Sequence, residues 1–118
     1  MVVEIRTYKL HPGTRDEFDS LFRTETLPLL KQFGIDVVGT AASATDDRHY
    51  LLVRSFPSAE ARLDQSQAFY GSDEWLSRLD GRVMACIDTY HTVVVEDDGT
   101  MCEGIRATLA RVPGMARS

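Results

Sequence analysis

The sequence predicts an α+β fold of the ferredoxin-like, or split βαβ, plan, with four antiparallel strands in one sheet. Strand-like alternation of apolar and polar side chains occurs at residues 2–10, 35–44, 49–56 and 86–96. Segments with helical spacing separate the first strand from the second and the third from the fourth. A chain of 118 residues, 43% of them hydrophobic, fits one compact domain of this kind. We expect the helices to cover a single face of the sheet.

The first strand, Val2 to Leu10, carries a polar row on an otherwise apolar segment. Alternation places Glu4, Arg6 and Tyr8 on one face and Val3, Ile5 and Thr7 on the other. A strand this apolar is predicted to be central in the sheet, so its polar face is covered. Because an unpaired buried charge is costly, the polar row needs partners. This stretch is therefore the first place to look for a site.

A long helix is predicted over residues 14–33, where apolar side chains recur at helical spacing. Thr14 and Glu17 fit a capping box, with Thr14 as the N-cap. Pro28 lies inside the helix and removes one backbone hydrogen bond, so we expect a bend there. Gly34 follows as the C-terminal cap.

The second and third strands, 35–44 and 49–56, are predicted to form a hairpin through a polar turn. In the second strand Gly39 allows another backbone or a ligand to approach closely. Arg54 lies in the third strand, which neighbours the first strand in a split βαβ sheet. Arg54 is therefore expected near the polar row of the first strand.

Two further helices are predicted before the last strand. Ser58 caps a helix that runs to about Tyr70, and Ser72 caps a shorter helix. Trp75 lies on the apolar stripe of this shorter helix. Two interpretations of Trp75 remain open: it fills the core between helix and sheet, or it stacks on a planar ligand.

The last strand, 86–96, is expected beside the first strand, with Ile87 and His91 on one face and Tyr90 on the other. His91 is the candidate general base, because the ordinary pKa of histidine suits proton abstraction at neutral pH. The alternative is a packed, hydrogen-bonded strand histidine without a catalytic role.

The predicted domain covers residues 1–96, and residues 97–118 form a tail of different character. A short helix is expected at about 103–112, where three apolar residues share one face: Ile105, Leu109 and Val112. So few anchors make the helix marginal alone, and we expect it to dock on the domain or on a second subunit. Disorder is expected from Pro113 onward.

Composition excludes several classes of function. Thirteen basic and 18 acidic residues give a net charge of -5 without a basic stripe, so nucleic acid is not an expected partner. No apolar run reaches the roughly 20 residues of a membrane span, and no signal peptide is recognised. Two isolated cysteines, Cys86 and Cys102, favour a reducing cytoplasm. Three histidines without metal-ligand spacing predict no metal site.

The pattern of the last two strands predicts a homodimer. Residues 50–53 and 93–95 are apolar on both sides of their strands, whereas helices on one face cover one side only. A two-fold symmetric copy buries the second face most simply, with the two sheets facing each other.

Two motifs resemble the NIPSNAP family, and the resemblance covers about residues 2–95. The first motif comprises Glu4-Ile5-Arg6-Thr7-Tyr8, Leu10, Pro12-Gly13, Leu27-Pro28-Leu29-Leu30 and Gly34. The second, Ser72-Asp73-Glu74-Trp75, is similar to the aspartate-x-glutamate-tryptophan segment of the family. Family members often have proline between the two acids, whereas here nothing intervenes.

The resemblance implies a dimeric α+β barrel. Relatives of this superfamily include cofactor-free monooxygenases of antibiotic biosynthesis, isomerases and lyases of small aromatic or lactone substrates, and haem-binding enzymes. The NIPSNAP branch has no general reaction attached to it, and its eukaryotic members look like mitochondrial adaptor proteins. Because no mitochondrial-type leader is recognised here, a bacterial cytoplasmic protein is expected.

Two functional hypotheses follow. In the first, each subunit of the dimer binds a small apolar or aromatic ligand in a pocket between sheet and helices, gated by Arg6, Tyr8, Arg54 and His91. Arg6 or Arg54 binds a carboxylate or enolate of the ligand, and Tyr8 donates a hydrogen bond. As an enzyme it would carry out cofactor-independent oxidation or isomerisation of an aromatic or polyketide-like substrate. In the second, a non-catalytic binding or adaptor module, Glu4 and the arginines form structural ion pairs. We expect no cofactor, and haem on His91 is the alternative left open.

Overall fold

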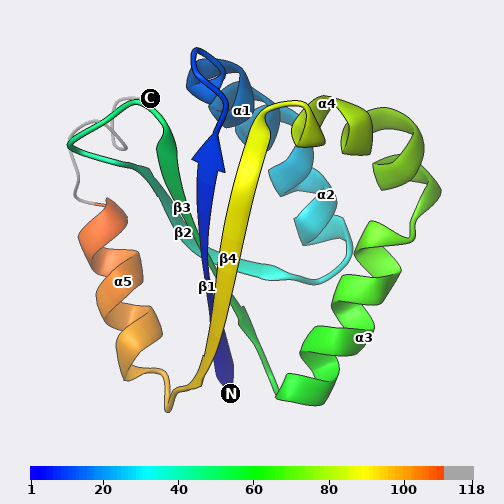
Figure 1. Cartoon of the computed structure of the whole chain (residues 1–118). Helices are drawn as coiled ribbons and strands as arrows, with labels where there is room; N and C mark the ends of the chain where they lie inside the picture. The colour runs from blue at the N-terminus through cyan, green and yellow to red at the C-terminus, as the bar shows by residue number, and fades with distance from the viewer. Residues whose placement is uncertain (111–118) are drawn as a thin grey trace.

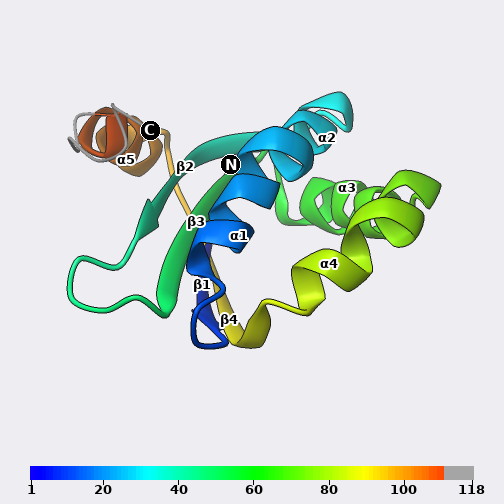
Figure 2. The same ribbon diagram turned by 90° about the horizontal axis from the view of Figure 1, so that it is seen from above.

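The computed structural model describes residues 1–110 as a four-stranded antiparallel sheet with helices on both faces (Figures 1 and 2). The strands are β1 (Val2–Leu10), β2 (Asp36–Ala42), β3 (His49–Phe56) and β4 (Ile87–Glu96), in the order β2-β3-β1-β4. The predicted ferredoxin-like α+β plan is confirmed, with β1 between β3 and β4. The polar row of β1 is consequently central in the sheet.

One continuous helical stretch follows β1, but its irregularity is not at the proline. It consists of α1 (Arg15–Leu21), a π-helical segment η1 (Phe22–Thr26) and α2 (Leu27–Gln32). The backbone N–H of Leu27 bonds the carbonyl of Phe22, five residues back. Pro28 then falls in the first turn of α2, directly after the π-helical segment. The irregularity of the hydrogen bonding is thus a π turn before Pro28, and the bend at Pro28 stays a prediction.

The capping predictions have mixed outcomes. Gly34 ends the stretch with φ of 75°, and the Ser58 hydroxyl accepts a bond from the Ala61 N–H at the start of α3 (Ala59–Tyr70), as predicted. Thr14 is the N-cap residue of α1, as predicted, but the predicted capping box does not form. Its hydroxyl donates instead to the carbonyls of His11 and Cys86, which ties the turn to the end of α4.

The helices of residues 1–96 lie on one face of the sheet, as expected. After α3, Ser72 accepts a bond from the Trp75 N–H at the start of a π-helical segment η2 (Trp75–Leu79), which continues into α4 (Asp80–Met84). The main core lies between these helices and the sheet, with Leu10, Leu30, Phe56, Phe69 and Leu79 almost fully buried. No helix among residues 1–110 is long and apolar enough to cross a membrane.

A fifth helix, α5 (Thr100–Ala110), lies on the opposite face, beside β2 (Figures 1 and 2). It begins three residues before the predicted start because Asp97 and Asp98 accept bonds from the N–H groups of its first turn. The expectation that this face is open is therefore only partly correct. Val112 and the disorder expected from Pro113 lie outside the described residues.

Gly39 explains how α5 fits against β2. A Cβ atom at this position would lie 2.5 Å from Cδ1 of Leu109 and 3.4 Å from its Cβ. The close approach predicted at Gly39 is thus made by a side chain of the tail helix. A small second core forms under α5 from Val3, Val38, Val53 and Cys102.

We predict that Gly39→Val loosens α5, because the added methyl groups occupy the place of Leu109. Amide hydrogen exchange should accelerate several-fold across residues 100–110 and remain unchanged in β1 and α3.

The matched control is Gly104→Ala on α5 itself, where an added Cβ meets no atom within 4 Å. This variant should slow exchange in α5, since alanine stabilises a helix by about 1 kcal/mol relative to glycine. Unchanged exchange in Gly39→Val would show that the docking of α5 does not depend on this contact.

Candidate functional site

A cleft of about 440 Å³ opens on the helix face of the sheet, between β1, β4, α3 and the η2–α4 segment. Its lining joins polar and apolar side chains: Arg6, Tyr8, Arg62, Leu63, Ser66, Gln67, Tyr70, Trp75, Asp80, Val83, Met84, Ile87 and Tyr90. Three of the predicted site residues therefore line one cleft: Arg6, Tyr8 and Trp75. Glu4 and Arg54 lie behind the cleft, on the same face of the sheet.

Glu4 is the centre of a charged cluster beneath the cleft. Its side chain is 0% exposed, and Arg54, its partner on β3, is 1% exposed. One carboxylate oxygen accepts a bond from Nε of Arg54 at 2.7 Å, and the other accepts one from Nε of Arg62 at 2.8 Å. Nη2 of Arg6 lies 3.6 Å from the second oxygen. The predicted proximity of Arg54 and Glu4 is confirmed, and three guanidinium groups surround one carboxylate.

Tyr70 connects this cluster to the cleft. Its phenol oxygen accepts a bond from Nη1 of Arg54 at 3.0 Å and one from Nη1 of Arg6 at 3.2 Å. Arg6 also donates from Nε to the Thr92 hydroxyl at 3.1 Å and lies over the ring of Tyr90, 5.0 Å from its centre. Arg6 is thereby held between β4 and α3, with its side chain 13% exposed.

Glu4 and Tyr8, the two residues of the polar row that can lose a proton, differ in their charge at neutral pH. Burial raises the pKa of Glu4, but the charges of Arg54 and Arg6 outweigh it, so the net pKa lies below the ordinary value of 4.5. Glu4 is therefore ionised at neutral pH. Burial, together with the neighbouring Tyr70, raises the pKa of Tyr8 to about 12. Tyr8 is consequently a neutral phenol, which suits a hydrogen-bond donor and not a base.

Trp75 fills the core between helix and sheet, the first of the two interpretations, whereas its stacking on a planar ligand stays a prediction. The residue is 5% exposed and packs in the core, with its ring 5.2 Å from that of Phe69 and 5.1 Å from that of Tyr70. Its indole N–H donates to Asp80 at 3.1 Å, which fixes the ring. One side of Trp75 nevertheless belongs to the cleft wall.

The inner face of α3 supplies site residues that the sequence analysis missed. Arg62, Ser66 and Tyr70 recur every four residues and line the cleft together. The sequence carried a signal for them, because this helix, AEARLDQSQAFY, has polar residues at helical spacing and no apolar stripe. A helix whose inner face carries arginine, serine and tyrosine cannot pack as closely against a sheet as a helix with an apolar stripe.

His91 does not belong to this cleft. It pairs with Thr7, so it points to the face of the sheet opposite Tyr8, and it is exposed. The predicted pocket shared by His91, Tyr8 and Arg54 is therefore not formed within the chain. Ile87 was assigned to the face of His91, but a register shift between Lys9 and Leu10 turns it into the cleft.

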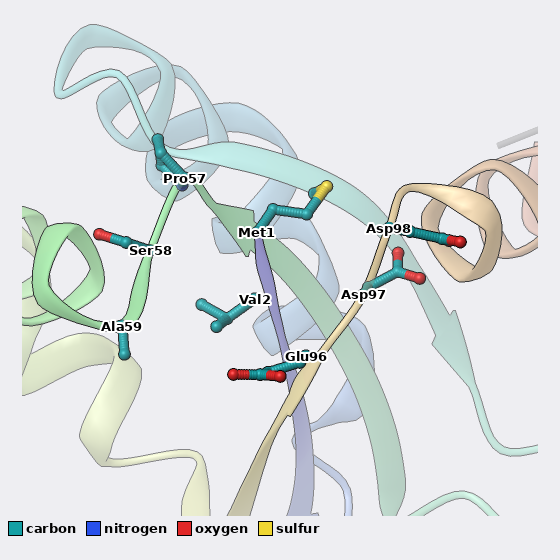
Figure 3. Close-up of a pocket in the computed structure, with 8 residues that line it drawn as sticks. All are labelled: Met1, Val2, Pro57, Ser58, Ala59, Glu96, Asp97 and Asp98. Carbon is teal, nitrogen blue, oxygen red and sulfur yellow. The ribbon is translucent and has the colours of Figure 1, made fainter.

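A second, wider groove of about 740 Å³ lies where β1 begins and β4 ends (Figure 3). Its polar lining comes from Ser58, Glu96, Asp97 and Asp98. Ser58 caps α3, whereas Asp97 and Asp98 cap α5, so these groups are engaged in starting helices. Within residues 1–110, no cluster of three or more His, Cys, Asp or Glu side chains is arranged to hold a metal ion. The cleft beside Tyr70 is the better candidate site.

Comparison with known families decides the classification. The family model described as NIPSNAP matches residues 3–95, which includes the polar row and the Trp75 segment. The chain belongs to the NIPSNAP family. No curated protein matches it.

Solved structures with the same fold include other NIPSNAP proteins. An uncharacterized NIPSNAP domain protein from Burkholderia xenovorans is 18% identical, with a TM-score of 0.74 over 82% of this chain and 94% of that one. A NIPSNAP family protein with unknown function from Agrobacterium tumefaciens is 21% identical, with a TM-score of 0.75 over 82% and 87%. A putative antibiotic biosynthesis monooxygenase from Nitrosomonas europaea is 15% identical, with a TM-score of 0.63 over 83% and 99%. At these identities the likeness concerns the fold.

We predict that Glu4→Gln lowers the free energy of unfolding by roughly 3–5 kcal/mol at neutral pH, because it leaves Arg54 buried without its counter-charge. Since the folded-state pKa of Glu4 is lowered, its contribution is present above pH 4.5 and is lost as the pH falls through the folded value. Urea unfolding from pH 7 to pH 3 should therefore show the wild type and Glu4→Gln converging at low pH. A difference that stays constant with pH would contradict an ionised Glu4.

Proposed function

We propose that this NIPSNAP domain binds a small molecule with an apolar or aromatic body in the cleft between β1, β4, α3 and α4. The observation that carries this proposal is the combination of aromatic walls and a fixed polar end in one cleft of about 440 Å³. Such sites typically unite apolar surface with a few oriented polar groups. Leu63, Met84 and Tyr90 support the proposal, because they are 45–56% exposed at the rim of the cleft.

Catalysis is the more specific form of the proposal. A cofactor-independent isomerisation of an aromatic or polyketide-like substrate, or its oxidation with dioxygen as the electron acceptor, needs an apolar cavity, an oxyanion partner and a proton acceptor. Tyr8 and Arg6 serve as the oxyanion partners. Because His91 faces away, Asp80 is the carboxylate that lines the cleft and takes the part of proton acceptor. The similarity to the putative antibiotic biosynthesis monooxygenase from Nitrosomonas europaea supports catalysis only through the shared fold and not through shared site residues.

The adaptor hypothesis is favoured by one observation of its own. Arg54 is 1% exposed, and its Nε and Nη1 donate to Glu4 and Tyr70, so this arginine serves the structure and is out of reach of a ligand in the cleft. If Arg6 and Tyr70 are likewise purely structural, the cleft needs no occupant.

Ligand binding can be followed through Trp75, the one tryptophan of the chain. We predict that small aromatic compounds shift the indole N–H signal of Trp75 in NMR titrations. Ser66→Phe should abolish this binding by filling the cleft, while the protein stays folded.

The matched control is Thr108→Phe, which places the same side chain beside an apolar depression under α5 on the opposite face. Thr108→Phe should leave the titration unchanged. If no aromatic compound shifts Trp75, or if Ser66→Phe binds as well as the wild type, the proposed site is wrong.

We also propose that the protein is a cytoplasmic homodimer. Val93 of β4 is 58% exposed and shares the sheet face of α5, which leaves an apolar strip beside that helix. A second copy packed on this strip would place the two sheets face to face. The free thiols of Cys86 and Cys102 are compatible with a reducing compartment.

Sedimentation velocity at micromolar concentration should give a dimer for the wild type and a monomer for Val93→Asp, which introduces a charge into the proposed interface. Leu63→Asp, at the rim of the cleft, is the control and should remain dimeric. A monomeric wild type would contradict the proposed assembly.

A further inference from the structure

The positively charged side chains around the cleft outnumber the negatively charged ones. Three guanidinium groups, from Arg6, Arg54 and Arg62, share the single carboxylate of Glu4. Asp80, the other carboxylate of the lining, accepts a bond from Trp75 and forms no ion pair within residues 1–110. The polar end of the cleft is therefore positive, although the whole chain has a net charge of -5.

Arg62 has further hydrogen-bond donors at the positive end of the cleft. Its Nε bonds Glu4, and its side chain is 22% exposed on the cleft wall. Its Nη groups make no hydrogen bond to any residue that the structure describes. A guanidinium group has five N–H donors in a fixed fork, so a ligand can still be bound by the outer ones.

Tyr70 presents a donor as well. Its oxygen already accepts N–H groups from Arg6 and Arg54. Two positive donors repel a hydroxyl hydrogen, so the hydrogen of Tyr70 is directed away from both and is left for another acceptor. Ser66 lies one turn from each of these residues on α3, and its buried hydroxyl has no partner among residues 1–110.

We infer that the cleft is selective for small organic anions, with Arg62, Arg6 and Tyr70 binding a carboxylate or enolate and the aromatic wall holding the apolar body. This inference rests on the proposed binding function and adds the chemical class of the ligand. Arg54 takes no direct part, because it is 1% exposed behind Tyr70. The ligand lies with its charge toward β1 and α3 and its apolar part toward Trp75, Val83 and the rim.

The test compares 2-naphthoate with 2-naphthamide, which have nearly the same shape and differ in charge. Isothermal titration calorimetry on the wild type should give at least about tenfold tighter binding of the naphthoate, since a hydrogen bond to a charged group is substantially stronger than a neutral one. Arg62→Gln and Tyr70→Phe should each reduce this preference about fivefold to tenfold and change the affinity for the amide less than twofold.

Arg106→Gln is the matched control, because it removes one positive charge from α5 on the opposite face of the sheet. Its preference for the naphthoate should equal that of the wild type. Thermal unfolding identifies any variant that has lost its fold, and equal binding of the two probes by the wild type would overturn the inference without any variant.

The outcomes separate the two proposals. Equal affinities for both probes in the wild type overturn the inference and leave the proposed binding function intact. Failure of both probes to bind overturns both. A preference that persists in folded Arg62→Gln and Tyr70→Phe, or that falls equally in Arg106→Gln, also overturns the inference, because the anion is then not held by this cluster.

Discussion

The ion cluster around Glu4 organises the helix face of this domain. A carboxylate with no solvent exposure requires compensation, and it obtains it from β3 through Arg54, from α3 through Arg62 and from its own strand through Arg6. These contacts connect residue 4 to residues 54 and 62, which are far from it in the sequence. Arg62 attaches α3 to the sheet through Glu4, and Phe69 of the same helix is buried in the core. The cleft lies beside these attachments, along the face of α3 that carries Arg62, Ser66 and Tyr70.

The composition of the cleft wall follows from the same constraint. Where α3 does not close on the sheet, the aromatic rings of Tyr70, Trp75 and Tyr90 remain partly uncovered by protein. Trp75 is fixed by Asp80 and by its neighbours, and Arg6 is fixed by Thr92 and Tyr70. A wall whose side chains are already ordered loses little entropy when a ligand binds. Structural and binding roles are therefore carried by the same side chains.

Much of the fold could be predicted from the sequence, since period-two alternation and the caps at Gly34, Ser58 and Ser72 are local signals. The position of Arg54 near the polar row of β1 followed from topology, whereas its pairing with Glu4 depends on the register between β1 and β3. Features that depend on distant packing could not be read in this way. Three features depend on contacts between remote segments: the π turn before Pro28, the register shift that moves Ile87, and the face of the sheet on which α5 packs. His91 was misplaced relative to Tyr8 because strand alternation fixes opposite faces only once the register between β1 and β4 is known.

The position of β4 has a consequence for solubility. It is an outer strand of ten residues, and one of its sides has unpaired backbone groups that another strand can bond. Three consecutive valines, Val93 to Val95, make this edge well suited to sheet extension between molecules. Two acidic residues lie at the ends of this strand: Asp88, which is also paired with Arg48 at 3.4 Å, and Glu96. Repulsion between the acidic groups of identical copies opposes fibrous association at the edge that the sheet leaves uncovered.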